Sequence, residues 1–257
     1  MTDEKQRILV EPRGHILVIT MNRPEAKNAF DLETAREMER ALDLLDDDRN
    51  LRIGIVTGAG GNFSAGADLK AVARGEWAQT EKRGGFGIFR RPPLKPLIAA
   101  VEGYAVGGGF ELCLSADMIV AARDARFGLP EVRYNVVAVG GALFRLQKRM
   151  PYNLVTELAM TGRFEEAGFF HRHGVVNRLT DPERALDGAI ELANEILDNG
   201  PTAVWATKEI IFQSNFWNEP VGWDEQLAIA APAVRSADSK EGLKAFAEKR
   251  KPRWEGR

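Results

Sequence analysis

The chain has 257 residues, a length that suits one large domain or two small ones. Hydrophobic residues make up 44% and charged residues 28%, as in an ordinary globular protein, and the formal net charge of −2 indicates neither a nucleic-acid partner nor a membrane surface. The single cysteine, Cys113, excludes an internal disulfide, and no apolar run has the length of a signal peptide or a membrane span, so we expect a cytoplasmic protein.

Four short apolar runs predict strands at residues 15–20, 53–57, 97–101 and 118–122. Nearly all of their residues are apolar, as in strands that are covered on both faces. Between the first two runs, Asp31 can cap a helix that places five apolar side chains on one face, namely Leu32, Ala35, Met38, Leu42 and Leu45. Strands that alternate with helices predict an α/β fold.

Residues 75–96 interrupt this alternation with glycine, arginine and proline, among which Trp77, Phe86 and Phe89 are interleaved. The composition favours a mobile surface connection. The alternative is a lid whose aromatic side chains face an apolar substrate tail.

After about residue 180 the strand signals stop, and helical patterns follow at residues 181–197, 224–234 and 239–250. We therefore expect an α/β core at residues 1–180 and a helical C-terminal region at residues 181–257. Because a helical region of this kind has no core of strands and helices of its own, we expect it to pack against a neighbouring part of the chain or against another subunit.

The stretch GYAVGGGFELCLSAD, residues 103–117, places three glycines ahead of Glu111 in an apolar setting. If a strand ends at Val101 and a helix begins near Gly108, the first amides of that helix have no internal partner and lie at its positive end. An oxyanion or a polarised carbonyl is the expected occupant, and Glu111 lies close enough to reach it. The alternative is that Glu111 only helps to cap the helix.

Two further stretches could contribute to the same site. Residues 62–70 follow the second predicted strand, so the amide near Ala67 could be a second donor and Asp68 could cap a helix. Glu131 follows another predicted strand and is also surrounded by apolar residues. Two carboxylates beside one set of amides suit proton transfer around a polarised carbonyl, and an apolar cleft would raise their pKa values.

Competing sites are weakly supported. Gly58 and Gly60 begin a dinucleotide-binding pattern, but Phe63 occupies the place of its third glycine. His171 and His173 could share a metal ion, yet no third ligand is evident, so we expect no metal site.

Taken together, these stretches resemble the crotonase superfamily, the enoyl-CoA hydratase/isomerase family. The resemblance rests on residues 22–29, 63–70, 99–117, 127–131 and 245–250, and it extends over about residues 8 to 250. It implies a spiral of ββα units at residues 1–180 that binds acyl-CoA. It also implies that residues 181–257 pack subunits into trimers or hexamers and close the pocket.

The resemblance also implies roles for single residues. The amides of Ala67 and Gly108 would hold the thioester oxygen as an oxyanion hole, Glu111 would activate the water that adds at C3, and Glu131 would handle the proton at C2. The residues that match the CoA-binding stretches are Ala26, Asn28, Ala65, Asp68, Leu69, Lys70 and Gly107. No cofactor is expected, since CoA is part of the substrate.

The expected reaction is reversible hydration of a 2-enoyl-CoA. The loop at residues 132–141 departs from the usual hydratase pattern, because Asn135 stands where glycine is common and proline is missing. Three alternatives therefore stay open: carnitinyl-CoA dehydration, 3,2-enoyl-CoA isomerisation and acyl-CoA binding with little catalysis.

Overall fold

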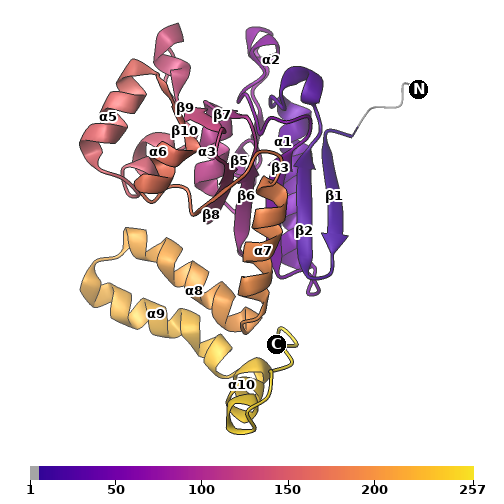
Figure 1. The fold of residues 1–257 in the computed structure, drawn as a ribbon. Helices are drawn as coiled ribbons and strands as arrows, with labels where there is room; N and C mark the ends of the chain where they lie inside the picture. The colour runs from indigo at the N-terminus through magenta and orange to yellow at the C-terminus, as the bar shows by residue number, and fades with distance from the viewer. Residues whose placement is uncertain (1–5) are drawn as a thin grey trace.

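The computed structural model describes residues 6–257 and is built around a six-stranded sheet (Figure 1). The strand order is β1 (Ile8–Arg13), β2 (Ile16–Met21), β3 (Ile53–Gly58), β6 (Leu97–Val101), β8 (Met118–Ala122) and β11 (Arg178–Thr180). Only β1 and β2 are antiparallel, and the other neighbours are parallel. The four predicted strands are confirmed as β2, β3, β6 and β8. They are almost continuously apolar because a hydrophobic cluster covers each face of the sheet.

A second, small sheet has the order β10 (Phe164–Glu166), β9 (Arg126–Gly128) and β7 (Tyr104–Val106). Each of these strands has three residues, too few for a hydrophobic period to be visible in the sequence. Along the chain, β6 of the large sheet is followed by β7 of the small sheet and then by helix α3 (Gly108–Ser115). This ββα order brings the start of α3 to the junction of the two sheets.

The first predicted helix is confirmed as α1 (Leu32–Asp47). The Asp31 side chain accepts the Thr34 amide at its start, and Ala35, Met38, Leu42 and Leu45 are buried. On the other face of the sheet, α7 (Ala185–Leu197) buries four small or apolar side chains: Ala185, Ala189, Leu192 and Ala193. The remaining core helices are α2 (Leu69–Ala73), α4 (Ala142–Leu146), α5 (Tyr152–Thr161) and α6 (Ala167–Arg172).

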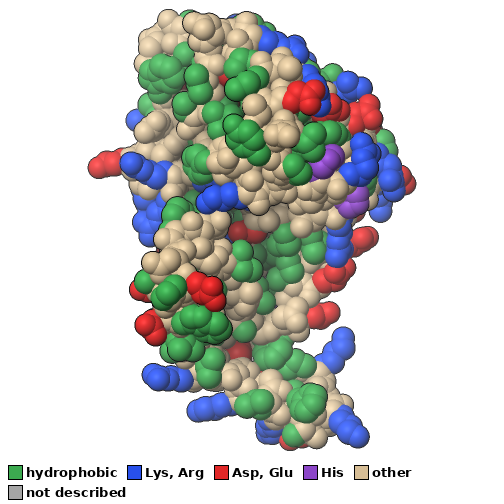
Figure 2. Space-filling model, turned by 90° about the vertical axis from the view of Figure 1, so that its left-hand side faces the viewer, with side chains coloured by type: hydrophobic (Ala, Val, Ile, Leu, Met, Phe, Trp, Pro, Cys, Tyr) green, Lys and Arg blue, Asp and Glu red, His purple; other side chains and the backbone are tan. Residues whose placement is uncertain are grey.

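Three C-terminal helices extend away from the core: α8 (Pro201–Gln213), α9 (Glu219–Val234) and α10 (Ala237–Ala247) (Figure 1). Helix α9 begins five residues earlier than the sequence pattern predicts, because the Asn218 side chain caps it, and α10 ends earlier than predicted. Helix α8 is tied to the core by the Lys208–Asp117 ion pair at 2.7 Å. No residue of α9 is buried, and apolar side chains line the hollow between these helices and the core (Figure 2).

The segment at residues 75–96 is not the surface connection that its composition favours. It contains the short strands β4 (Gln79–Thr80) and β5 (Gly84–Gly85), and Arg83 at the hairpin is only 2% exposed. The Arg83 guanidinium pairs with Asp43 at 2.7 Å and Asp46 at 2.8 Å, both on α1. These ion pairs fix the segment against the core. Among residues 6–257, no helix is long and apolar enough to cross a membrane.

Candidate active site

The amides of Ala67 and Gly108, the two candidate donors named from the sequence, lie on two adjoining chain segments. Next to Ala67, Phe30 donates to the Gly66 carbonyl at 2.8 Å and Asp68 donates to the Phe30 carbonyl at 2.8 Å. The bonded groups in this parallel bridge are the Gly66 carbonyl and the Asp68 N–H, which lie on either side of Ala67. The N–H of Ala67 itself therefore points away from Phe30. Gly108 is the first residue of α3, so its N–H has no partner within the helix.

Glycines make the close approach of these segments possible. A Cβ added to Gly66, whose φ is +89°, would lie 3.0 Å from the Gly108 nitrogen. Gly107 has φ of 57° and ψ of −128°, a conformation that is essentially restricted to glycine. A Cβ on Gly109 would lie 2.2 Å from the Ser64 carbonyl oxygen. The glycine triplet therefore allows the start of α3 to lie directly on the segment that carries Ala67.

Buried polar side chains fix that segment from the other side. Asn28 is 1% exposed, and its amide nitrogen donates to the carbonyls of Ala59 and Asn62 at 2.9 and 2.8 Å. Ser64 Oγ donates to the Asn28 carbonyl at 2.8 Å and accepts the Gly66 amide at 3.1 Å. In this structure Asn28 shapes the loop beside the amides through backbone contacts.

The other residues of the predicted CoA-binding set fall into two neighbouring segments. Ala26 ends the 3-10 helix η1 (Pro24–Ala26), and the next residue, Lys27, accepts the Ala65 amide at 2.9 Å. Asp68 caps α2, as predicted, and pairs with Arg23 at 2.9 Å. The last two, Leu69 and Lys70, are exposed in the first turn of α2.

Glu111 is buried in α3, with 4% of its surface exposed. Its Oε1 accepts the Ala142 amide at 3.2 Å. Burial raises the pKa of Glu111 to about 7; the negative charge of Glu131 adds to the increase, whereas the amides of Ala142 and Gly140 oppose it. A carboxylate with this pKa can both take up and release a proton near neutral pH.

Glu131 lies in the 3-10 helix η2 (Pro130–Tyr134), which follows β9. A Cβ added to Gly107 would lie 3.2 Å from Glu131 Oε1, so this carboxylate is beside the start of α3. Its Oε2 is buried and has no hydrogen-bond partner within residues 6–257, and burial raises the pKa of Glu131. The structure thus brings both predicted carboxylates to the same glycine-rich turn.

An aromatic stack covers one side of this turn. The rings of Phe30 and Phe86 are parallel with centroids 4.3 Å apart, and Phe89 follows at 4.8 Å from Phe86. A Cβ on Gly108 would lie 2.6 Å from the Phe86 ring, and one on Gly140 would lie 2.4 Å from Phe89 and 2.5 Å from Glu111 Oε2. Of the three aromatic residues noted in the sequence, Phe86 lies beside Gly108 and Phe89 beside Gly140, whereas Trp77 is 68% exposed.

Sequence reasoning missed Arg145, which lies in α4 directly after the Gly140–Gly141 pair. Its guanidinium donates to the carbonyl oxygens of Gly140 and Phe89. The available signal was a single cation in the run Ala142–Leu146, where the other four residues are apolar. Such a cation needs partners from elsewhere in the chain, which the sequence alone does not identify.

The other chemically interesting groups are already engaged. His171 and His173 contact the carbonyls of Val176 and Phe169 through Nδ1, and no metal-binding group of three or more ligands occurs within residues 6–257. Cys113 is fully buried, and burial raises the pKa of its thiol.

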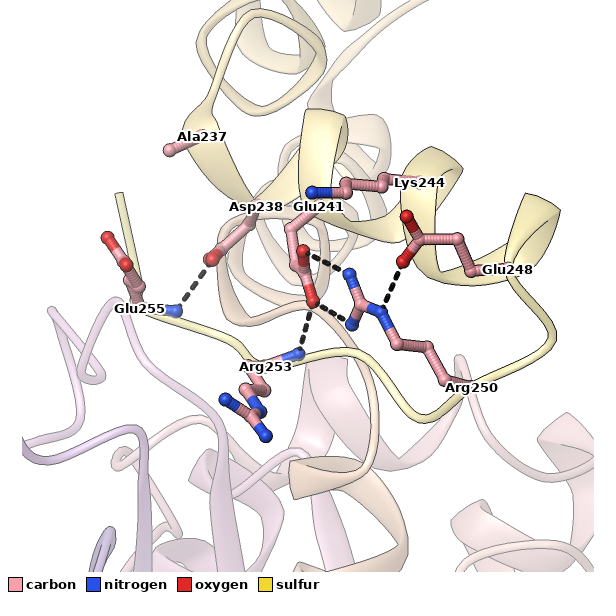
Figure 3. Close-up of a pocket in the computed structure, with 8 residues that line it drawn as sticks. All are labelled: Ala237, Asp238, Glu241, Lys244, Glu248, Arg250, Arg253 and Glu255. Carbon is pink, nitrogen blue, oxygen red and sulfur yellow. Dashed lines mark hydrogen bonds and ion pairs between the residues drawn. The ribbon is translucent and has the colours of Figure 1, made fainter.

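A cavity of about 460 Å³ lies between α10 and the C-terminal tail, at the opposite end of the molecule from α3 (Figures 1 and 3). Its central residue is Glu241, which pairs with Arg250 at 2.6 Å and accepts the Arg253 amide at 2.8 Å. These contacts lower the pKa of Glu241 to about 2. Because this carboxylate stays charged and paired, it is unsuited to proton transfer.

Comparisons with known proteins find relatives that match nearly the whole chain. Residues 11–257 match the family described as "Enoyl-CoA hydratase/isomerase". The chain is 40% identical to the enoyl-CoA hydratase EchA19 of Mycobacterium tuberculosis, with 97% of this chain and 96% of the relative covered. It is 42% identical to a carnitinyl-CoA dehydratase of Proteus mirabilis, with 98% and 99% covered. The crystal structure of the enoyl-CoA hydratase EchA1 from Mycobacterium marinum superposes with a TM-score of 0.95 at 53% identity, covering 98% and 99% of the two chains.

Proposed function

The chain belongs to the enoyl-CoA hydratase/isomerase family and has the crotonase fold, and from this premise we propose its reaction. It is an enoyl-CoA hydratase that adds water reversibly to the 2,3-double bond of a 2-enoyl-CoA. The observation that carries the proposal is a pair of carboxylates at the turn that begins with the Gly108 amide: Glu111, which is buried, and Glu131, which is half-buried with its Oε2 out of contact with solvent.

The proposed oxyanion hole consists of the Ala67 and Gly108 amides. The thioester oxygen would accept both N–H groups, which would stabilise the negative charge that develops when the thioester becomes an enolate. The positive end of α3 adds to this stabilisation. The acyl carbons beyond the thioester then lie next to α3 and the glycine turn, within reach of both carboxylates.

In the hydration direction, Glu111 takes a proton from water while the water oxygen bonds to C3. The electron pair of the double bond moves toward C2 and the thioester, and Glu131 supplies the proton to C2. Dehydration reverses each step. Burial raises both pKa values, and the negative charge of Glu131 raises that of Glu111 further, which favours a pair that holds one proton between its two members.

The CoA moiety is proposed to lie along the segments around Ala26, Ala65 and Asp68, with Leu69 and Lys70 at the exposed entrance. CoA is part of the substrate, and the proposed reaction needs no further cofactor. Every proton and electron pair in it comes from water, the thioester or the two glutamates.

We also propose that the chain assembles with copies of itself as a trimer or hexamer in the cytoplasm. One stripe of α9 exposes Trp223, Leu227 and Val234, which are spaced by four and seven residues, and Phe246 of α10 is 86% exposed. A homo-oligomer would cover these apolar side chains, with α8–α10 supplying the interface and closing the pocket. Light scattering of the purified protein measures the subunit number.

The test of the reaction is turnover of crotonyl-CoA, followed as loss of the conjugated-enoyl absorbance. We expect Glu131→Gln to lower kcat by about 10²- to 10⁴-fold, because one proton-transfer group is lost. Calorimetric binding of butyryl-CoA, which has no double bond to hydrate, should be retained in the same variant. Unchanged turnover in Glu131→Gln would refute the mechanism, and tight butyryl-CoA binding without wild-type turnover would favour an acyl-CoA binding protein.

Carnitinyl-CoA dehydration is the second candidate, favoured by the aromatic stack beside Glu111 and by relatives that are 42–44% identical. Aromatic faces bind quaternary ammonium groups, and carnitinyl-CoA differs from 3-hydroxybutyryl-CoA by a trimethylammonium group at C4. The two dehydrations are therefore compared directly by kcat/KM. A preference for carnitinyl-CoA of more than about tenfold would assign the chain to that reaction. Incubation with a 3-enoyl-CoA tests the isomerase alternative.

A further inference from the structure

Arg145 is a partly buried cation that contacts only neutral groups. Its Nη1 donates to Ser115 Oγ at 2.9 Å and to the Gly140 carbonyl at 3.1 Å, and its Nη2 donates to the Phe89 carbonyl at 2.5 Å. Among residues 6–257, no carboxylate is hydrogen-bonded to it; Arg149 nearby repels its charge, and the charge of Glu111 attracts it without direct contact. A cation removed from water without a directly paired counterion is costly, so simple packing does not account for it.

The three groups that Arg145 binds surround Glu111. Ser115 is one turn further along α3 and donates to the Glu111 carbonyl at 2.9 Å. Gly140 lies against Glu111 Oε2 and is two residues before Ala142, whose amide donates to Oε1. Phe89 lies against the same face of Gly140 as Glu111 Oε2. One guanidinium therefore joins the helix, the loop and the aromatic stack around this carboxylate.

We infer that Arg145 is a positioning residue, which holds the Gly140–Ala142 backbone and the Phe89 wall in place so that the Glu111 carboxylate is fixed for proton transfer. The inference rests on the proposed hydratase function. Arginine suits the role because its planar fork binds several acceptors at once, whereas lysine provides a single ammonium point charge.

Arg145 also acts on the charge of Glu111. The charged groups that face Glu111 are Glu131 from η2, which raises its pKa, and Arg145 from α4, which lowers it. The amides of Gly140 and Ala142, which Arg145 holds in place, lower the pKa as well. Loss of Arg145 removes the cation and loosens these amides, so both effects raise the pKa of Glu111. A base with a higher pKa is ionised only at higher pH.

The test compares Arg145→Gln, Arg145→Lys and the control Arg149→Lys. Arg149 is a partly buried cation in the adjoining turn that donates to the Leu114 and Ala116 carbonyls, and it has no hydrogen bond to Gly140 or Phe89. The readouts are the pH profile of kcat/KM with crotonyl-CoA, the separate kcat and KM values, and urea unfolding.

For Arg145→Gln we expect kcat to fall by about 100-fold with KM nearly unchanged, since a small displacement of a catalytic group has this cost. The acidic limb of the profile should move about one unit to higher pH. Arg145→Lys should show the loss in kcat with a smaller shift, and Arg149→Lys should keep the wild-type profile whatever its stability.

A folded Arg145→Gln protein with the wild-type acidic limb would overturn the inference and leave Arg145 a structural role only. If Arg145→Gln does not fold, the result for Arg145→Lys decides: an unchanged kcat and limb would overturn the inference. A wild-type protein without crotonyl-CoA turnover would instead refute the proposed function, so the two failures are distinguishable.

Discussion

Replacing Glu111 by glutamine should stabilise the folded chain while it removes the proposed base. Burial raises the pKa of Glu111 from 4.5 to about 7. Between these values the folded state binds more protons than the unfolded state, so the free energy of unfolding falls as the pH rises through this window. A difference of about 2.5 units, at about 1.4 kcal/mol per unit, corresponds to about 3 kcal/mol at about pH 8. Glutamine is neutral and nearly the same size, and its Oε1 can still accept the Ala142 amide.

The assay is urea denaturation of wild type and Glu111→Gln across this pH range, at one protein concentration because subunit dissociation would otherwise contribute. The variant should match wild type near pH 4.5, the lower end of the window, and gain stability steadily up to about pH 8. Glu131→Gln should gain stability in the same direction, since burial raises the pKa of that carboxyl group too. A stability difference that is constant with pH, or a Glu111→Gln protein less stable than wild type at high pH, would show that the pKa of Glu111 is not raised in the folded chain.

Two further substitutions test the framework around the site. Gly109→Ala places a Cβ 2.2 Å from the Ser64 carbonyl oxygen, so we expect the free energy of unfolding to fall by about 2 kcal/mol and crotonyl-CoA turnover to decrease. An unchanged Tm and turnover would contradict the packing of Gly109 against Ser64. Arg83→Leu leaves the carboxylates of Asp43 and Asp46 without their shared cation, so the free energy of unfolding should fall by about 3 kcal/mol in urea. A loss below about 0.5 kcal/mol would mean that this ion pair contributes no more than an exposed one.

Much of the fold could be predicted because its signals are local. The runs that form β2, β3, β6 and β8 are apolar enough to predict strands that are covered on both faces. The three-residue strands of the small sheet were missed because they are too short to show a hydrophobic periodicity. Their position depends on the longer strands of the large sheet. The segment around Arg83 was misjudged because its glycines and charges are typical of loops, whereas its ion-pair partners lie about forty residues away in α1.

For the site, the groups that can take part were visible along the chain: glycines that leave amides uncovered, the cap at Asp68, and two glutamates in apolar stretches. Their surroundings depend on contacts between distant segments. The Ala142 amide, which donates to Glu111, is 31 residues away from it in the sequence. The Phe86 ring stacks on Phe30 and also contacts the glycine turn. The pKa of a carboxyl group depends on the charges, amides and apolar surfaces that pack around it, and most of these come from distant parts of the chain. For this reason Glu111 could be named from the sequence, whereas its pKa of about 7 and its contact network follow from the folded structure.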